Sequence, residues 1–193
     1  DPDEIASLLD YMENYGNGLT GVQLYHYNKQ KYRDIAIVTL LLGTGIRVSE
    51  CVGLNISDVD FKNNGIRVLR KGGNEMVVYF GLEVEAALKD YLELSRNKIT
   101  PLSGHENALF LSGQRKRISV DAIEKMVKKY SSAISAKTIT PLKLISTYGT
   151  ALYRETGDIY LVADVLGHSD VNTTKKHYAR LSDDRRRAAS KAV

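Results

Sequence analysis

Hydrophobic residues recur at helical spacing through most of the chain, and a short central region alternates instead. The helical pattern predicts helices over residues 4–14, 29–42, 47–54, 83–97, 119–134, 141–156, 159–166 and 171–178. A polar, tyrosine-rich stretch separates the first two. Alternation predicts strands over 56–61, 65–69 and 76–80, with the Gly-rich segment 70–74 as a hairpin turn. The pattern therefore predicts a mainly α protein with one small antiparallel sheet, an α+β fold.

One predicted helix, 141–156, carries two apolar rows. Leu144, Tyr148 and Leu152 are spaced by four, which is typical of an ordinary core face. Leu142 and Ile145 form a second row, on a flank of the first turn that should meet water. Core packing explains the first row and leaves the second without a reason.

Composition and charge alone exclude few classes of protein or partner. The 193 residues are 43% hydrophobic, enough for the core of one large domain or two small ones, and the net charge of +4 gives a mild bias toward polyanionic partners. Cys51, the single cysteine, has no internal disulfide partner, so we expect a small core residue in a reduced, cytoplasmic setting. No apolar run approaches the roughly 18 residues of a membrane span. The acidic opening Asp1–Glu4 is typical of a helix start inside a longer protein, of which we expect this chain to be a fragment.

Several kinds of site have no signal in the sequence. It contains no P-loop glycine motif, no Cys/His spacing for zinc and no carboxylate group suited to a two-metal nuclease. We therefore expect neither a nucleotide nor a metal cofactor, and the candidate nucleophiles are Ser, Thr and Tyr hydroxyls.

Four local patterns point to chemistry. Arg47 follows Gly-Thr-Gly and precedes Glu50 by three residues, while Lys71 lies in the Arg-Lys-Gly-Gly hairpin. His168 follows a helix-ending glycine, and Tyr178 comes ten residues later. Each has an ordinary explanation in isolation: a surface ion pair, a solvated lysine, a capping histidine and a packing tyrosine. Their order along the chain is the informative feature.

In this order, TGIRVSE, RKGG, TP…STYGTALYRETGD and LGHSDVNTTKKHY, the sequence resembles the catalytic domain of the tyrosine recombinases. These are the integrases of phages and conjugative transposons and their chromosome-resolving relatives. The resemblance runs from about Pro2 to Lys191. It implies one catalytic domain over residues 1–193, helical around a three-stranded sheet, without the N-terminal domain that completes the clamp on DNA. It also implies double-stranded attachment sites as partner, a tetrameric homo-oligomer on DNA, and action in the bacterial cytoplasm.

The resemblance also implies roles for individual residues. Arg47 would hold the scissile phosphate with Glu50 as structural support, and His168 would hydrogen-bond the same phosphate. Lys71 would protonate the departing 5′ oxygen. Tyr178 would be the nucleophile, forming a transient 3′-phosphotyrosine without any cofactor.

The family's His-x-x-Arg motif follows a Thr-Pro turn, and here its two positions fall on Leu142 and Ile145. Thr140 and Pro141 are present, and the residues around the motif fit the family. Aliphatic side chains form no hydrogen bond to a phosphate, and removing one preorganised donor commonly costs about 10²–10³ in rate. The second apolar row therefore stands where an active-site face should be polar, and we expect impaired cleavage.

Three functions remain open. The first is a site-specific recombinase, favoured by Arg47, Lys71, His168 and Tyr178. The second is a DNA-binding or synapsis module of the same fold without cleavage, favoured by Leu142 and Ile145. The third, a topoisomerase-like relaxer, fits the LGHS…TT pattern least.

Two further features carry expectations about DNA and assembly. Two basic runs supply cations expected to face the duplex, although such runs are usually just solvated: Arg115, Lys116, Arg117, Lys125, Lys128 and Lys129. Residues 182–193 are expected to form a separate short helix, capped by Ser182. The resemblance implies that this helix is exchanged with a neighbouring protomer. The alternative is a frayed terminus.

Overall fold

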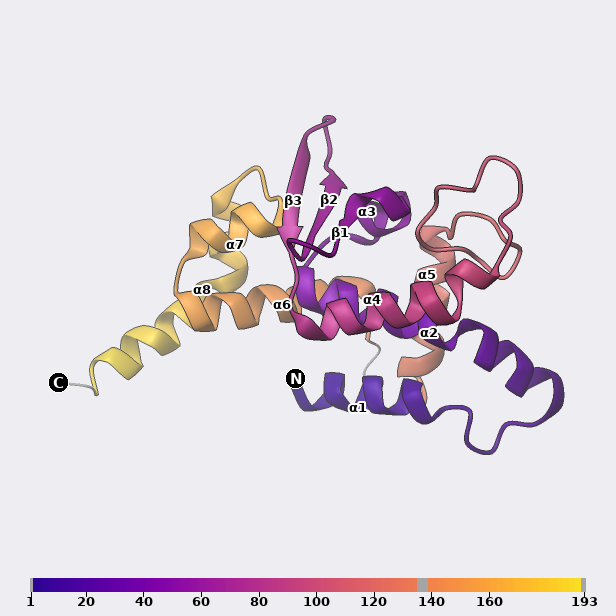
Figure 1. Cartoon of the computed structure of the whole chain (residues 1–193). Coiled ribbons are helices and arrows are strands. Elements are labelled where there is room, and N and C mark those ends of the chain that lie inside the picture. Colours follow the sequence, from indigo (N-terminus) through magenta and orange to yellow (C-terminus); the bar gives the residue numbers. More distant parts are fainter. Residues whose placement is uncertain (1, 135–138, 192–193) are drawn as a thin grey trace.

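The structure, a computed structural model, describes residues 2–134 and 139–191 as a set of helices with a small sheet on one side (Figure 1). The helices are α1 (Pro2–Asn14), α2 (Gly21–Thr44), α3 (Val48–Gly53), α4 (Leu82–Leu94), α5 (Val120–Ser131), α6 (Pro141–Thr156), α7 (Ile159–Leu166) and α8 (Val171–Ala189), with 3-10 turns η1 (Ile56–Asp58) and η2 (Arg96–Lys98). The mainly α fold with a small sheet is confirmed.

The sheet is antiparallel, with strand order β1-β2-β3. Its strands are β1 (Val59–Asp60), β2 (Gly65–Leu69) and β3 (Glu75–Tyr79). Ile66 pairs with Val78 and both are buried against the helices, as alternation predicts. The β2–β3 hairpin projects from the body and carries Lys71 near its tip (Figure 1). The first predicted strand is shorter than expected, because its opening residues form η1.

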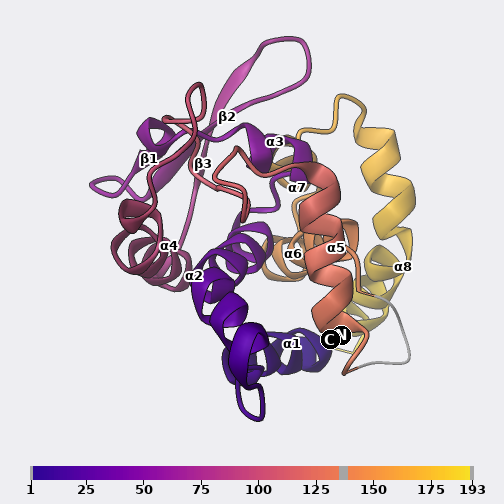
Figure 2. The ribbon, with the colours of Figure 1, turned by 90° about the vertical axis from the view of Figure 1, so that its right-hand side faces the viewer.

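Two hydrophobic clusters hold the helices. The larger surrounds α2, which lies between α1, α4 and α6 (Figure 2) and buries Ile37, Leu40 and Leu41 completely. Cys51 is buried in the same cluster, as expected, and burial raises the pKa of its thiol. The smaller cluster joins α6, α7 and α8 around Tyr153, Val162, Leu166 and Tyr178. The region that carries His168 and Tyr178 thus has a core of its own.

α2 begins eight residues before the predicted start at residue 29. The apolar residues of its first two turns do not form a core face, since Val22 and Tyr25 are exposed, so periodicity alone misses these turns. Tyr27 anchors them instead: it is 4% exposed, and its hydroxyl donates to the carbonyls of Met12 (2.8 Å) and Glu13 (2.7 Å). A single aromatic side chain therefore attaches this end of α2 to the end of α1.

The predicted helix starting at Ser182 is wrong, because α8 runs unbroken from Val171 to Ala189. Its N-cap is Asp170, whose carboxylate accepts from the Asn172 N–H at 2.8 Å. The last turns leave the body (Figure 1) and are exposed. Arg185 still contacts α6, donating to the carbonyls of Tyr153 and Arg154. Residues 192–193 lie outside the described residues.

Two other predicted helices end early. The helix predicted over 83–97 stops at Leu94 and continues as η2, and the helix predicted over 119–134 stops at Ser131. Among the described helices, none is both long and apolar enough to cross a membrane.

Replacing Tyr27 by Phe should lower the free energy of unfolding by about 1 kcal/mol, because two carbonyls at the end of α1 lose the hydroxyl proton that they share. Tyr25→Phe is the matched control, since Tyr25 is 60% exposed. Urea denaturation of both variants measures the difference. Equal stabilities would contradict an anchoring role for Tyr27.

Candidate active site

Arg47 is positioned by the turn between α2 and α3. Gly45 ends α2 with a φ of 67°, a left-handed conformation that suits glycine, and a Cβ there would collide with the Tyr148 ring. The Arg47 N–H donates to Glu50 Oε2 at 2.9 Å, and its Nη2 donates to the Gly167 carbonyl at 3.0 Å. Glu50 is 7% exposed, so a surface ion pair is excluded. The carboxylate supports the Arg47 backbone, while the guanidinium reaches the end of α7.

Arg70, which the sequence patterns did not single out, reaches the same end of α7 from the hairpin. Its Nη2 donates to the Val165 carbonyl at 2.6 Å, and its Nε lies 3.8 Å from Glu50 Oε1. Its side chain is only 10% exposed, and Nε and Nη1 have no hydrogen-bond partner among the described residues. Gly167 has a φ of 68°, and a Cβ there would collide with the Arg70 guanidinium. The sequence alone carries no signal for this role, because Arg70 and Gly167 are brought together only by the fold.

His168 follows that glycine directly. Its Nδ1 lies 2.7 Å from Oγ1 of Thr174, which is fully buried, so Nε2 is the nitrogen left to meet a ligand. Burial lowers the pKa of His168, and the charges of Arg47, His177 and Arg70 lower it further. The ring is therefore neutral near pH 7 and acts as a hydrogen-bonding group rather than a cation.

One cavity of about 360 Å³ collects these groups, and we call it the Arg47 cavity. Arg47, Arg70, Lys71 and His168 line it together with Asp170, the N-cap of α8. Lys71 reaches this cavity from the exposed turn of the β2–β3 hairpin. Guanidinium and ammonium groups at one cavity match the charge and geometry of a phosphate. The structure thus brings together three of the predicted residues and adds Arg70.

Tyr178 lines a neighbouring space of about 670 Å³, the Tyr178 cavity, which shares His168 with the Arg47 cavity. Its ring is 2% exposed and packs against Tyr153 and Leu166. The hydroxyl lies so close to Gly149 that a Cβ there would collide with it. Burial raises the pKa of Tyr178, against the opposing effect of a hydrogen bond with Thr150. In this conformation the phenol is covered and protonated.

Leu142 and Ile145 lie in the first turns of α6 and face the Tyr178 cavity. The Thr140 hydroxyl caps the helix by accepting from the Lys143 N–H at 3.2 Å, and Pro141 is the first residue. Leu142 is 72% exposed, while Ile145 packs against the smaller cluster. Both line the Tyr178 cavity and an apolar groove of about 640 Å³ that also reaches Arg47. The second apolar row therefore lies beside the candidate active site.

The six cations predicted from the basic runs differ in what they contact. Lys128 lines the apolar groove, whereas Lys129 lies over the rings of Tyr15 and Tyr130. Lys125 pairs with Asp121 at 2.7 Å.

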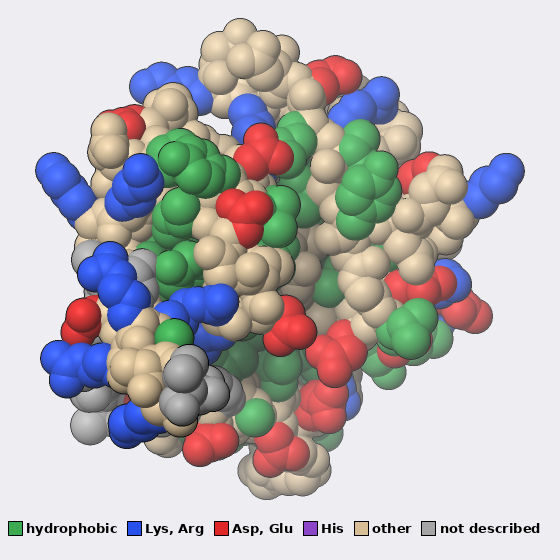
Figure 3. Space-filling model, turned by 90° about the vertical axis from the view of Figure 1, so that its left-hand side faces the viewer, with side chains coloured by type: hydrophobic (Ala, Val, Ile, Leu, Met, Phe, Trp, Pro, Cys, Tyr) green, Lys and Arg blue, Asp and Glu red, His purple; other side chains and the backbone are tan. Residues whose placement is uncertain are grey.

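The remaining three belong to the loop that precedes α5. Arg115 and Lys116 are exposed there. Arg117 instead donates to the carbonyls of Val52 and Leu54 and to Asn55 Oδ1, at 2.5–3.0 Å, which attaches the loop to the end of α3. Viewed from α7 and α8, Lys and Arg side chains also gather along one edge of the molecule, where α8 lies (Figure 3).

Residues 1–185 match the model of the phage integrase family. The chain is 37% identical over 193 residues to tyrosine recombinase XerS of Streptococcus uberis, covering 98% of this chain and 54% of the relative. It therefore spans about half the length of the curated relatives it matches.

Two solved structures are similar in fold. XerA recombinase gives a TM-score of 0.75 at 30% identity, covering 92% of this chain and 58% of that one. The Tn1549 transposon integrase in complex with transposon right-end DNA gives 0.72 at 25% identity, covering 100% of this chain and 65% of that one.

The pKa of His168 predicts how stability depends on pH. Because the folded state holds this pKa below the ordinary value of about 6.5, the unfolded state takes up the proton first as the pH falls. The free energy of unfolding should therefore decrease from pH 7 downward through the unfolded pKa, until the pH reaches the folded one. Urea denaturation of His168→Gln should show a shallower decrease, and the exposed His26→Gln should keep the native slope. An unchanged slope in His168→Gln would contradict this assignment.

Proposed function

Because the chain belongs to the phage integrase family of tyrosine recombinases, we propose that it is a site-specific recombinase domain that binds duplex DNA but has impaired strand cleavage. One observation carries the proposal. The Arg47 cavity keeps Arg47, Lys71 and His168 together, while Leu142 and Ile145 place aliphatic groups beside it.

The Arg47 cavity is suited to a backbone phosphate. A phosphodiester under attack gains negative charge on its non-bridging oxygens, and fixed donors stabilise that charge. Arg47 donates one N–H to the Gly167 carbonyl, and its other guanidinium N–H groups can donate to the phosphate. His168 can hydrogen-bond the phosphate through Nε2, because Nδ1 lies next to Thr174. Lys71, on the projecting hairpin, lines the same cavity, and in this proposal it gives a proton to the departing 5′ oxygen.

The cleavage step shows what is missing. Tyr178 Oη would bond to phosphorus, the bond from phosphorus to the 5′ oxygen would break, and Lys71 would protonate that oxygen. The phenol proton needs an acceptor, because its pKa is raised by burial. Leu142 is no acceptor, and Ile145 cannot replace a second guanidinium. Tyr178 must also leave its packing against Gly149 and Leu166 before it can attack.

The alternative is a module of the same fold that serves DNA binding or synapsis and has lost cleavage. The exposure of Leu142 favours it, since a 72% exposed leucine contributes little to the core and does nothing for phosphate chemistry. A topoisomerase-like relaxer needs the same missing groups and gains no support from the site.

The projecting half of α8 supports a proposal about assembly. Its last turns are exposed and leave the body (Figure 1), and Arg186, Arg187 and Lys191 lie there. We infer that residues 182–191 contact a neighbouring protomer when the chain assembles into a homo-oligomer on DNA in the bacterial cytoplasm. The segment does so as an extension of α8, which would couple Tyr178 to the contact.

DNA affinity should fall steeply with salt, with a slope of log K against log salt of about −0.9 for each phosphate contacted. Lys116→Gln and Lys128→Gln should each make the slope shallower by about one. Lys125→Gln is the matched control, because Lys125 already pairs with Asp121. Fluorescence anisotropy with duplex DNA measures the slopes. Binding without salt dependence, or none at low salt, would refute the DNA-binding proposal.

Restoring the two motif positions should restore cleavage. Leu142→His with Ile145→Arg supplies an acceptor and a second guanidinium, and should yield a covalent protein–DNA adduct on a denaturing gel. Leu142→Gln with Ile145→Gln is the matched polar control and should yield none. Adding Tyr178→Phe to the restored protein should abolish the adduct. A folded, DNA-binding restored protein without an adduct would show that other defects prevent cleavage.

A further inference from the structure

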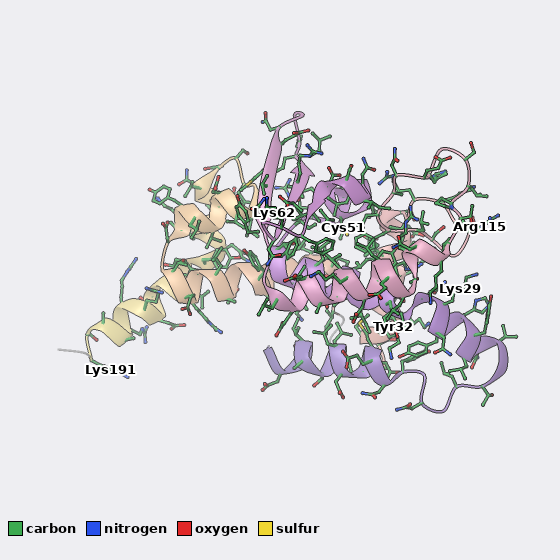
Figure 4. The ribbon with its side chains drawn as sticks, in the orientation of Figure 1. Lys29, Tyr32, Cys51, Lys62, Arg115 and Lys191 are labelled. Atoms are coloured by element: carbon green, nitrogen blue, oxygen red, sulfur yellow. The ribbon has the colours of Figure 1, made fainter. Side chains whose placement is uncertain are left out.

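A second basic cavity lies between α2, η2 and the loop before α5, and we call it the Lys29 cavity. Its volume is about 220 Å³, and among the described residues its lining includes four cations and no Asp or Glu. Lys29 and Arg115 mark this end of the molecule, away from α7 and α8 (Figure 4). The four cations are Lys29, Arg33, Lys98 and Arg115. None of them lines the Arg47 cavity.

Arg33 is the buried cation of this site, at 8% exposure. Nε and Nη2 donate to Asp34 Oδ1 at 2.9 and 2.6 Å, and Nη1 donates to the Leu111 carbonyl at 3.1 Å. A guanidinium has five N–H groups, so two remain beyond these three bonds. The other oxygen of Asp34 accepts from the Tyr130 hydroxyl at 3.2 Å. Asp34 therefore offsets Arg33 and is engaged on both of its oxygens.

Lys98 and Arg115, which lie at the rim of the cavity with Lys29, belong to segments whose backbone is held in place by hydrogen bonds. Arg115 has a φ of 64°, a left-handed conformation that is uncommon and strained for a residue with a side chain. Its N–H donates to the Ser112 carbonyl, and its own carbonyl accepts from Leu102, both at 3.0 Å. Lys98 ends η2, which the 4% exposed Arg96 attaches to the same loop. The loop thus holds Arg115 at the cavity despite the backbone strain.

The charge of these rim cations is not compensated locally. No carboxylate among the described residues lies within ion-pair distance of Lys29, Lys98 or Arg115. Three cations without an acidic partner at one concave site attract an anion more strongly than scattered surface charges do. The volume is below the roughly 300–1,000 Å³ of pockets for drug-sized ligands, which favours a small anionic group.

We propose that the Lys29 cavity binds a phosphate group, distinct from the phosphate at the Arg47 cavity. The group is carried either by the DNA backbone or by a free phosphate-bearing molecule. Guanidinium and ammonium donors around a small cavity suit both sources. The proposal does not depend on whether the protein cleaves DNA.

Titration with inorganic phosphate at constant ionic strength, followed by thermal denaturation, tests the site. Lys98→Gln with Arg115→Gln should raise the phosphate Kd about tenfold or more, because two charged donors are removed. Lys62→Gln with Lys125→Gln is the matched control: it removes the same charge at two residues that do not line the cavity, and should leave the Kd unchanged. All four side chains are exposed, so the variants should fold.

Duplex DNA distinguishes the two sources. If the backbone supplies the phosphate, the salt slope of DNA binding in Lys98→Gln with Arg115→Gln becomes shallower than in the control, by about one for each phosphate that the variant no longer binds. If the slope is equal in both while phosphate binding is weakened only in the first, a free phosphate-bearing molecule is the ligand. Equal phosphate affinity in the two variants overturns the proposal, whatever the DNA result.

Discussion

The carbonyl end of α7 is the junction on which the candidate active site depends. Arg47 donates to the Gly167 carbonyl and Arg70 to the Val165 carbonyl, where the helix dipole places partial negative charge. Glu50 joins the two, since one of its oxygens accepts from the Arg47 N–H and the other faces Arg70 Nε. This junction connects α3, the hairpin and the turn before α8. Through it, residues more than a hundred positions apart in sequence share one cavity.

The residues at this junction and Tyr178 are held in place by different parts of the fold. Arg47 and Arg70 are held by backbone carbonyls and a buried carboxylate, so in the proposed function they are in place before a phosphate binds. Tyr178 depends on the smaller cluster instead, where Gly149 leaves just enough room for its hydroxyl. Ile145 packs into that same cluster and Leu142 lies exposed next to it. In the proposed mechanism the two aliphatic residues therefore alter the surroundings of Tyr178 and leave Arg47 and its partners intact.

Sequence patterns predicted the helices, the antiparallel sheet and the family, because periodicity and the order of short motifs can be read without knowing which distant residues are in contact. They missed the start of α2, where one buried tyrosine replaces an apolar face, and the continuity of α8 past Ser182, which looked like a cap. They also missed Arg70 and the Lys29 cavity, which depend on side chains brought together from distant segments. The roles of Arg47, Lys71, His168 and Tyr178 came from resemblance, and Arg117 proved to be engaged with α3.

The most direct test of impaired cleavage is the unmodified protein on a nicked duplex that traps any cleavage product. Binding and covalent attachment should be measured on the same samples, by native and by denaturing gels. We predict a shifted band on the native gel and little or no covalent band on the denaturing gel. A strong covalent band from the unmodified protein, absent in Tyr178→Phe, would contradict the proposal, because cleavage would then proceed with Leu142 and Ile145 in place.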